Sequence, residues 1–263
     1  MLFVGLDLAW STKNSSGIAV IDGNKKKGDV VSFGLVDSDD EIIKTIAKVV
    51  GNRNAFVAID APLIVPNEEG RRVAEEITGN LFRRYNAGAH PANRSHLASW
   101  TGTIRGEEIA KRLQKEGFAH SPYITQYEED RKFFEVYPHP SMVVLFDLKT
   151  VIPYKNKPNR NYESRWAAFR EYQRHMKDLE EATPQISMPK EVLKTKIEEL
   201  KAQKLKDYED VLDGIFCAYI AYYAWGNPNR CAVLGDMERG YIMTPVFDSM
   251  RLALQEDRMQ KKL

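Results

Sequence analysis

The chain has 263 residues, of which 43% are apolar and 29% are charged, and this balance is typical of an ordinary globular protein. Its formal net charge of +1 alone says nothing about the partners of the protein. No apolar run approaches the ~18 residues of a membrane span, and the first residues lack a signal-peptide pattern, so we expect a cytoplasmic protein.

Short apolar runs at the start of the chain predict three strands. They cover residues 2–8, 17–21 and 30–36, and polar turns separate them. Three strands joined by such short turns are typical of an antiparallel meander.

A helix and a fourth strand follow the meander. Ser38 and Glu41 form a capping-box pattern, apolar residues then recur at helical spacing, and Gly51 marks the end of the helix. A further apolar run over 55–59 ends at Asp60. The order of strand, helix and strand predicts a crossover connection, so we expect the fourth strand to lie parallel to a neighbour.

The rest of the chain alternates core elements with long polar segments. We expect a fifth strand over 133–137 and a buried helix over 207–225, the latter because an apolar face runs along it. The other expected elements are helices over 71–78, 106–116, 163–181 and 190–206, a long loop over 79–103, a hairpin of 232–234 with 241–243, and a terminal helix from 248.

These elements predict one α/β domain over residues 1–263 with a five-stranded mixed sheet. Three antiparallel strands would be followed by parallel strands, and helices would flank the sheet. The core would comprise residues 1–62, 131–148 and 207–245, with insertions at 63–130 and 149–206.

Five acidic residues lie within or beside the apolar elements. Asp7 and Asp60 stand at the ends of two predicted strands, and Glu135 lies on a third. Asp210 and Asp213 are three residues apart on the buried helix, so they share one face. A carboxylate in an apolar strand is costly unless it is paired, hydrogen-bonded or bound to metal. Because parallel strands deliver their C-terminal ends to one edge of a sheet, we expect Asp7 and Asp60 to be neighbours.

Neighbouring carboxylates repel one another, and a hard divalent cation removes this conflict. Oxygen ligands suit Mg²⁺ or Mn²⁺, so the sequence predicts one of these ions as a cofactor. The chemistry that uses such a site is phosphoryl transfer. The sequence contains no nucleophile elbow, Walker loop or dinucleotide fingerprint that would indicate a different chemistry.

Two stretches of the chain are rich in basic residues. Residues 71–112 hold eight Lys/Arg against four Asp/Glu, and residues 149–177 hold eight against two. The first stretch comes soon after Asp60, and arginine binds phosphate through paired hydrogen bonds. A solvated basic surface is the alternative interpretation. The substrate-binding hypothesis names Arg71, Arg72, Arg83, Arg84, Arg94 and His90.

Four short motifs occur in a fixed order along the chain. They are Gly5-Leu6-Asp7 with the strand at 17–20, then 58–63, 135–138 and 210–214. Together they resemble the RNase H-like superfamily, and most closely the predicted RNase H-fold nucleases grouped as domain of unknown function 429. The last motif is similar to the paired aspartates of the RuvC-type Holliday junction resolvases.

The resemblance implies an RNase H-like fold and a metal-dependent nuclease that cleaves DNA or RNA. It implies that Asp7, Asp60, Asp210 and Asp213 are metal ligands, with Glu135 as a further ligand or support. These five acids are the predicted catalytic residues, and nucleic acid is the predicted partner. The sequence leaves open whether the protein forms a homodimer.

Two other functions are compatible with the sequence. One is a catalytically silent RNase H-like module that binds nucleic acid or protein, since a fold does not fix an activity. The other is a phosphotransferase of the actin and sugar-kinase type, whose opening strand is similar. That fold needs a second related domain with its own phosphate loop, which the chain lacks.

Overall fold

A seven-stranded mixed sheet with helices on both faces forms the centre of the protein, in a computed structural model that describes residues 1–99 and 102–260. The strand order is β5-β6-β4-β1-β2-β3-β7. The five predicted strands are all present: β1 (Leu2–Asp7), β2 (Ser16–Gly23), β3 (Lys27–Val36), β4 (Ala55–Asp60) and β6 (Arg131–Glu135). The first three form the expected antiparallel meander, and β4 pairs in parallel with both β1 and β6.

The sheet is two strands larger than the five predicted. Each insertion adds one short strand to an edge of the sheet: β5 (Ala119–His120) beside β6, and β7 (Gln185–Ser187) beside β3. Strands of two and three residues are too short to show an alternating apolar pattern, so they could not be predicted from local sequence.

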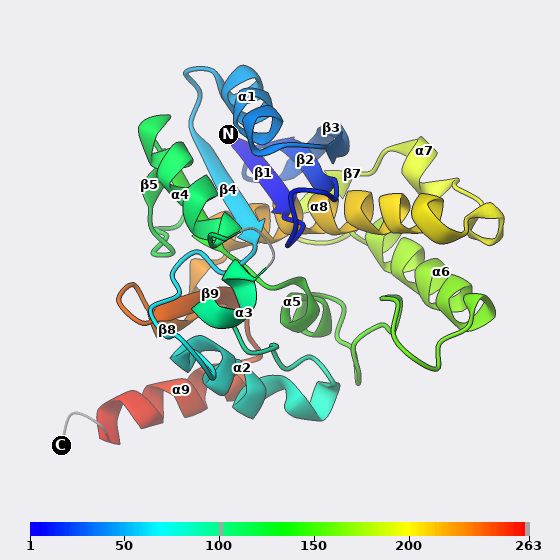
Figure 1. Ribbon diagram of the computed structural model, residues 1–263. Coiled ribbons are helices and arrows are strands. Elements are labelled where there is room, and N and C mark those ends of the chain that lie inside the picture. The colour runs from blue at the N-terminus through cyan, green and yellow to red at the C-terminus, as the bar shows by residue number, and fades with distance from the viewer. Residues whose placement is uncertain (100–101, 261–263) are drawn as a thin grey trace.

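Alternating side chains divide the core into two halves. Leu2, Val4 and Leu6 on β1 pack with helices α1 (Asp39–Val50) and α4 (Arg105–Lys115). Phe3 on the same strand faces the opposite side, where it packs against α8 (Ala202–Gly226). Figure 1 shows α1 and α4 on one side of the sheet and α8 on the other. The period of two along each strand therefore builds a three-layer α/β fold.

The first helix begins and ends as predicted. Ser38 is the N-cap residue of α1, and its side chain accepts a hydrogen bond from the backbone N–H of Glu41 at 3.2 Å. The Glu41 carboxylate accepts from the backbone N–H of Asp37 at 2.8 Å, one residue before the position of a standard capping box. Gly51 follows the last turn with φ of 52°.

The insertions depart most from prediction. The expected loop over 79–103 contains the end of one helix and all of another. Residues 190–206, expected to form one helix, contain a short helix, a 3₁₀ turn and the first residues of α8. Within the described ranges, no helix has the length and apolar character needed to cross a membrane. The remaining elements are α2 (Val73–Phe82), α3 (Arg94–Ala98), α5 (Pro138–Leu145), α6 (Tyr162–Asp178), α7 (Lys190–Leu193), β8 (Cys231–Asp236), β9 (Gly240–Pro245) and α9 (Asp248–Gln260).

Helix α8 lies unusually close to the sheet because glycines face it. A Cβ built on Gly5 would lie 2.1 Å from the backbone oxygen of Gly214. A Cβ on Gly17 would lie 1.8 Å from the carbonyl oxygen of Asp210. Both distances are far below van der Waals contact, so only glycine permits this approach. The contact fixes the height of the acidic face of α8 relative to β1 and β2.

An alanine at Gly17 is expected to lower the free energy of unfolding by about 1–3 kcal/mol, the usual cost of overpacking a core. Helix α8 would have to move away from the sheet to admit the methyl group. Gly34→Ala on β3 is the control, because nothing lies within 4 Å of its Cβ. Urea titration measures both variants, and equal midpoints would contradict the tight contact.

Candidate acidic site

The two strand-end aspartates are direct neighbours. Asp7 ends β1 and Asp60 ends β4, and the two residues are paired in the parallel register of these strands. This is the juxtaposition that the sequence predicts. Both side chains line a cavity of about 770 Å³, together with Asp210 from α8 and Glu135 from β6. Acids distant in the chain therefore share one cavity at the C-terminal edge of the parallel strands.

The two aspartates of α8 have different surroundings. Asp210 faces the cavity, where it lies close enough to Asp7 for the two acids to shift the pKa of one another. Asp213, one turn further along, is fully buried and does not line the cavity. Its carboxylate accepts hydrogen bonds from Tyr154 at 2.9 Å and Tyr172 at 3.1 Å. The sequence predicts Asp213 as a metal ligand, but tyrosine hydroxyls of the second insertion engage its carboxylate, and it lies outside the cavity that the other predicted ligands line.

Burial and mutual repulsion raise the pKa of three cavity carboxyls. Burial is the main cause for Asp7, Asp60 and Asp210 alike. The charge of Asp7 raises the pKa of Asp60 further, and it contributes to a pKa of about 8 for Asp210. The site therefore holds more carboxylates than it can ionise together near neutral pH.

Two lysines supply positive charge inside the site. The Nζ of Lys155 lies 2.5 Å from Asp213 and 3.3 Å from Glu209. The Nζ of Lys206 lies 3.3 Å from Glu209 and also pairs with Asp210. Burial lowers the pKa of Lys155, but the nearby carboxylates, Asp213 first, outweigh this effect and raise it well above its usual range. Both ammonium groups are therefore charged parts of the site, and Lys155 is the more deeply buried of the two.

Neither lysine is among the site residues predicted from the sequence. Lys206 precedes Asp210 by four residues on one helix, a spacing that favours an ion pair and could have been noticed. Lys155 lies in an irregular segment before α6, 58 residues from Asp213, and no local pattern indicates its contact.

The oxygen donors of the cavity suit a hard divalent cation. Asp7 and Asp60 form no direct ion pair within residues 1–99 and 102–260, and the charge of Lys155 only partly opposes the effect of burial on the pKa of both. Across the same residues, no three carboxylate, imidazole or thiolate groups already surround a common point at ligand distance. Lys206 forms an ion pair with Asp210. Binding of a metal by Asp7, Asp60 and Asp210 would therefore require the Lys206 side chain to turn toward solvent. The chemistry of the donors fits Mg²⁺ or Mn²⁺ under that condition.

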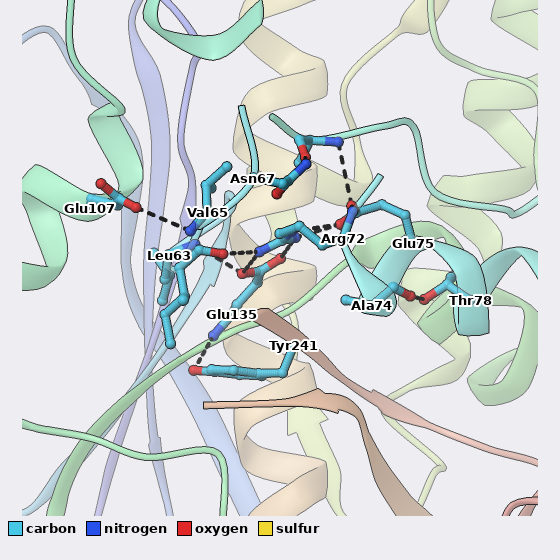
Figure 2. A network of polar contacts seen from close by, with 12 residues as sticks. Leu63, Val65, Asn67, Arg72, Ala74, Glu75, Thr78, Glu107, Glu135 and Tyr241 are labelled. Carbon is cyan, nitrogen blue, oxygen red and sulfur yellow. Dashed lines mark hydrogen bonds and ion pairs between the residues drawn. The ribbon is translucent and has the colours of Figure 1, made fainter. Parts of the chain in front are cut away.

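Glu135 is held by a buried ion-pair network (Figure 2). Arg72 donates to both carboxylate oxygens of Glu135, at 2.6 and 3.0 Å, and to Glu75 at 2.6 Å. The backbone N–H of Leu63 donates to Glu135 at 2.9 Å. All three charged residues are 3% exposed or less. Glu135 thus supports the segment after Asp60, and its oxygens are engaged by Arg72 rather than open to a metal.

The six predicted substrate-binding residues occupy three different environments. Arg72 belongs to the buried network, which corrects its assignment to phosphate binding. Arg94 pairs with Glu107 at 3.2 Å, and Arg84 hydrogen-bonds to Tyr85 and stacks on its ring. The structure brings only three of the six together along one cavity wall: Arg71, Arg83 and His90.

His139 lies at the boundary of this basic wall and the acidic cavity. Burial, with a smaller contribution from the charge of Lys155, lowers the pKa of His139 to about 3. Its Nδ1 is 2.9 Å from the hydroxyl of Tyr137. The imidazole is therefore neutral at physiological pH and cannot act as a general acid there.

The chain matches a protein family model that spans the residues of the acidic site. No curated protein matches the chain. A family model described as "Protein of unknown function (DUF429)" matches residues 5–239, which include the strand-end aspartates, Glu135 and both aspartates of α8. The matched span covers most of the chain, and the protein therefore belongs to the DUF429 family.

Proposed function

We propose that the protein is a metal-dependent nuclease, which hydrolyses phosphodiester bonds of DNA or RNA at the acidic cavity. One observation carries the proposal: Asp7 and Asp60 lie in register on adjacent parallel strands, and Asp210 faces them from α8. Desolvation and mutual repulsion raise the pKa of all three carboxyls. Such a cluster stores an electrostatic cost that a divalent cation would relieve.

The topology supports an RNase H-like assignment. The order β3-β2-β1-β4-β6, with a meander followed by two parallel strands, is the arrangement expected from the motif resemblance. The acids stand at the ends of its central strands and on the helix that crosses them. We therefore infer that this chain is an RNase H-like member of its family, with the edge strands β5 and β7 as additions.

Asp7, Asp60 and Asp210 would hold Mg²⁺ or Mn²⁺. When bound, such an ion lowers the pKa of water and stabilises charge on the leaving oxygen. Lys155, fixed by Asp213 and Glu209, offsets part of the negative charge that would otherwise repel a phosphate. Glu135 and Arg72 hold the chain after Asp60 in place, so the strand-end carboxylate keeps its position.

A cleavage screen tests the proposal. Single-stranded, duplex and branched DNA and RNA would be incubated with Mg²⁺ or Mn²⁺, with EDTA as the metal-free reference. We expect cleavage that depends on metal and falls by about a hundredfold or more in Asp7→Asn, because a metal ligand is lost.

Asp207→Asn is the matched control for this experiment. Asp207 lies on α8 one turn before Asp210, but outside the cavity. The Asp207→Asn variant should therefore cleave nucleic acid at the same rate as the natural protein. Equal activity of Asp7→Asn and the natural protein would rule out this site. Binding of nucleic acid with no cleavage under any condition would favour the silent binding module instead.

A further inference from the structure

A second cavity opens beside the acidic one, and its charged residues are all basic. It measures about 550 Å³, and its lining contains no carboxylate. The basic residues along it, which we call the basic groove, are Arg71, Arg83, Lys155, Lys157 and Arg160, with His90 and His139.

The two insertions build this groove together. Arg71, Arg83 and His90 come from the first insertion, and Lys157 and Arg160 come from the second. The backbone N–H of Val151 donates to the carbonyl of Tyr85 at 2.8 Å, which ties the two segments together. Neither insertion alone would form the groove.

Four of the five Lys/Arg side chains of the groove have no acidic partner among the described residues, and Lys155, which pairs with Asp213 and Glu209, is the exception. Within the described parts of the chain, Arg71, Arg83 and Lys157 form no ion pair and no side-chain hydrogen bond, and all three are exposed. Arg160 donates only to the backbone oxygen of Lys155, at 2.9 Å. Most arginines elsewhere pair with a carboxylate: Arg53, Arg72, Arg94, Arg105, Arg112, Arg165, Arg170, Arg239 and Arg251.

The groove and the acidic cavity are continuous. His90, His139, Lys155 and Lys157 line both of them. A polyanion bound along the unpaired cations of the groove would therefore extend into the acidic cavity. There, a metal ion or Lys155 would have to offset the repulsion between its phosphates and the carboxylates.

We propose that the basic groove binds the sugar–phosphate backbone of a single polynucleotide strand and guides it into the acidic cavity. This extends the proposed nuclease function, but it predicts binding that does not depend on cleavage. A volume of about 550 Å³ is that of a site for a small ligand, which suits a short piece of one strand and not both strands of a duplex. The basic side chains of the lining would contact phosphates, which carry no sequence information. The affinity for the polynucleotide should therefore depend more on salt concentration than on nucleotide sequence.

Binding of a fluorescein-labelled, mixed-sequence single-stranded 20-mer, as DNA and as RNA, tests this inference. The Asp7→Asn protein in EDTA would be titrated by anisotropy over a range of salt concentrations. Arg83→Gln in that background should bind about tenfold more weakly, the effect of losing one charge-assisted contact. The slope of log K against log salt should fall by roughly 0.7, the value for one phosphate of a single strand. Arg83→Gln/Lys157→Gln should lose about twice as much slope.

Arg84→Gln is the matched control. Arg84 is the adjacent exposed arginine, but it stacks on Tyr85 and does not line the groove. Its affinity and salt slope should equal those of the parent. Equal losses in the Arg83 and Arg84 variants, or no binding by the parent, would overturn the proposal. Competition by pyrophosphate as strong as that by the oligonucleotide would show a small-anion site instead. Retained groove binding without cleavage by the natural protein would reject the nuclease activity alone.

Discussion

Replacing Arg72 with methionine is expected to lower the free energy of unfolding by about 3–5 kcal/mol, the usual cost of removing one partner of a buried ion pair. The guanidinium lies between Glu135 and Glu75, as Figure 2 shows, and it also donates to the backbone oxygen of Ile64 at 2.8 Å. Its loss would leave two buried carboxylates without a cation. Burial already raises the pKa of Glu135, and Arg72 is the main opposing influence.

Arg94→Met is the matched control for this prediction. Arg94 also pairs with a glutamate, Glu107, but its side chain is 39% exposed, so its loss should cost less than about 1 kcal/mol. Urea unfolding followed by circular dichroism measures both variants. If they lose the same stability, the network does not hold the chain after Asp60.

Adding Glu135→Gln to Arg72→Met should recover part of the loss, because one of the two stranded charges is removed. Glu75 would still be unpaired, so recovery should be incomplete. A double variant that is less stable than Arg72→Met would contradict the charge argument and point to packing as the role of Arg72.

The core strands could be predicted because each contains a short stretch of mostly apolar residues of its own. The meander, the crossover helix and the parallel strand at 55–60 follow from local patterns and from the handedness and length of connections. The prediction that Asp7 and Asp60 are neighbours follows from the parallel pairing of their strands, since parallel strands in register end side by side.

Long-range side-chain contacts could not be predicted in this way. Arg72 and Glu135 are 63 residues apart, and Lys155 and Asp213 are 58 residues apart. Arg72 was grouped with the exposed Arg71 because the two are adjacent, but they face opposite environments at the start of α2. The spacing of Asp210 and Asp213 places them one turn apart on α8, but it could not show that tyrosines of the second insertion would enclose Asp213 while Asp210 lines the cavity.

Replacing Asp60 with asparagine is expected to stabilise the metal-free protein at pH 8. Burial, and then the charge of Asp7, raise the pKa of Asp60 well above 3.8. The folded state therefore binds this proton more tightly than the unfolded state, and stability falls as the pH rises from about 4 through the folded-state pKa. Asparagine cannot ionise, so the variant avoids this loss. We expect a gain of about 2 kcal/mol at pH 8, roughly 4–8 °C in Tm, and a smaller difference at pH 5.

Metal should reverse the order of stability. A cation held by the ionised carboxylates stabilises the natural protein by about 2.7 kcal/mol at a concentration of 100 times Kd. The Asp60→Asn variant lacks one of the carboxylates that would bind the metal, so its Tm should rise much less on addition of Mg²⁺ or Mn²⁺. Asp207→Asn, on α8 but outside the cavity, should respond like the natural protein. The measurement is a thermal melt in EDTA and across a metal titration at pH 5 and pH 8.

The effect of pH on Tm tests the electrostatics of the cavity, and the effect of metal on Tm tests whether the cavity binds a cation. A gain in Tm at pH 8 for Asp60→Asn, with no metal response in the natural protein, would mean that Lys155 and Lys206 supply the only cations the site accepts. A metal response that is equal in the natural protein and in Asp60→Asn would place the ion elsewhere. Only a response that requires Asp60 and grows with pH is consistent with metal binding by carboxylates that burial and repulsion keep partly protonated.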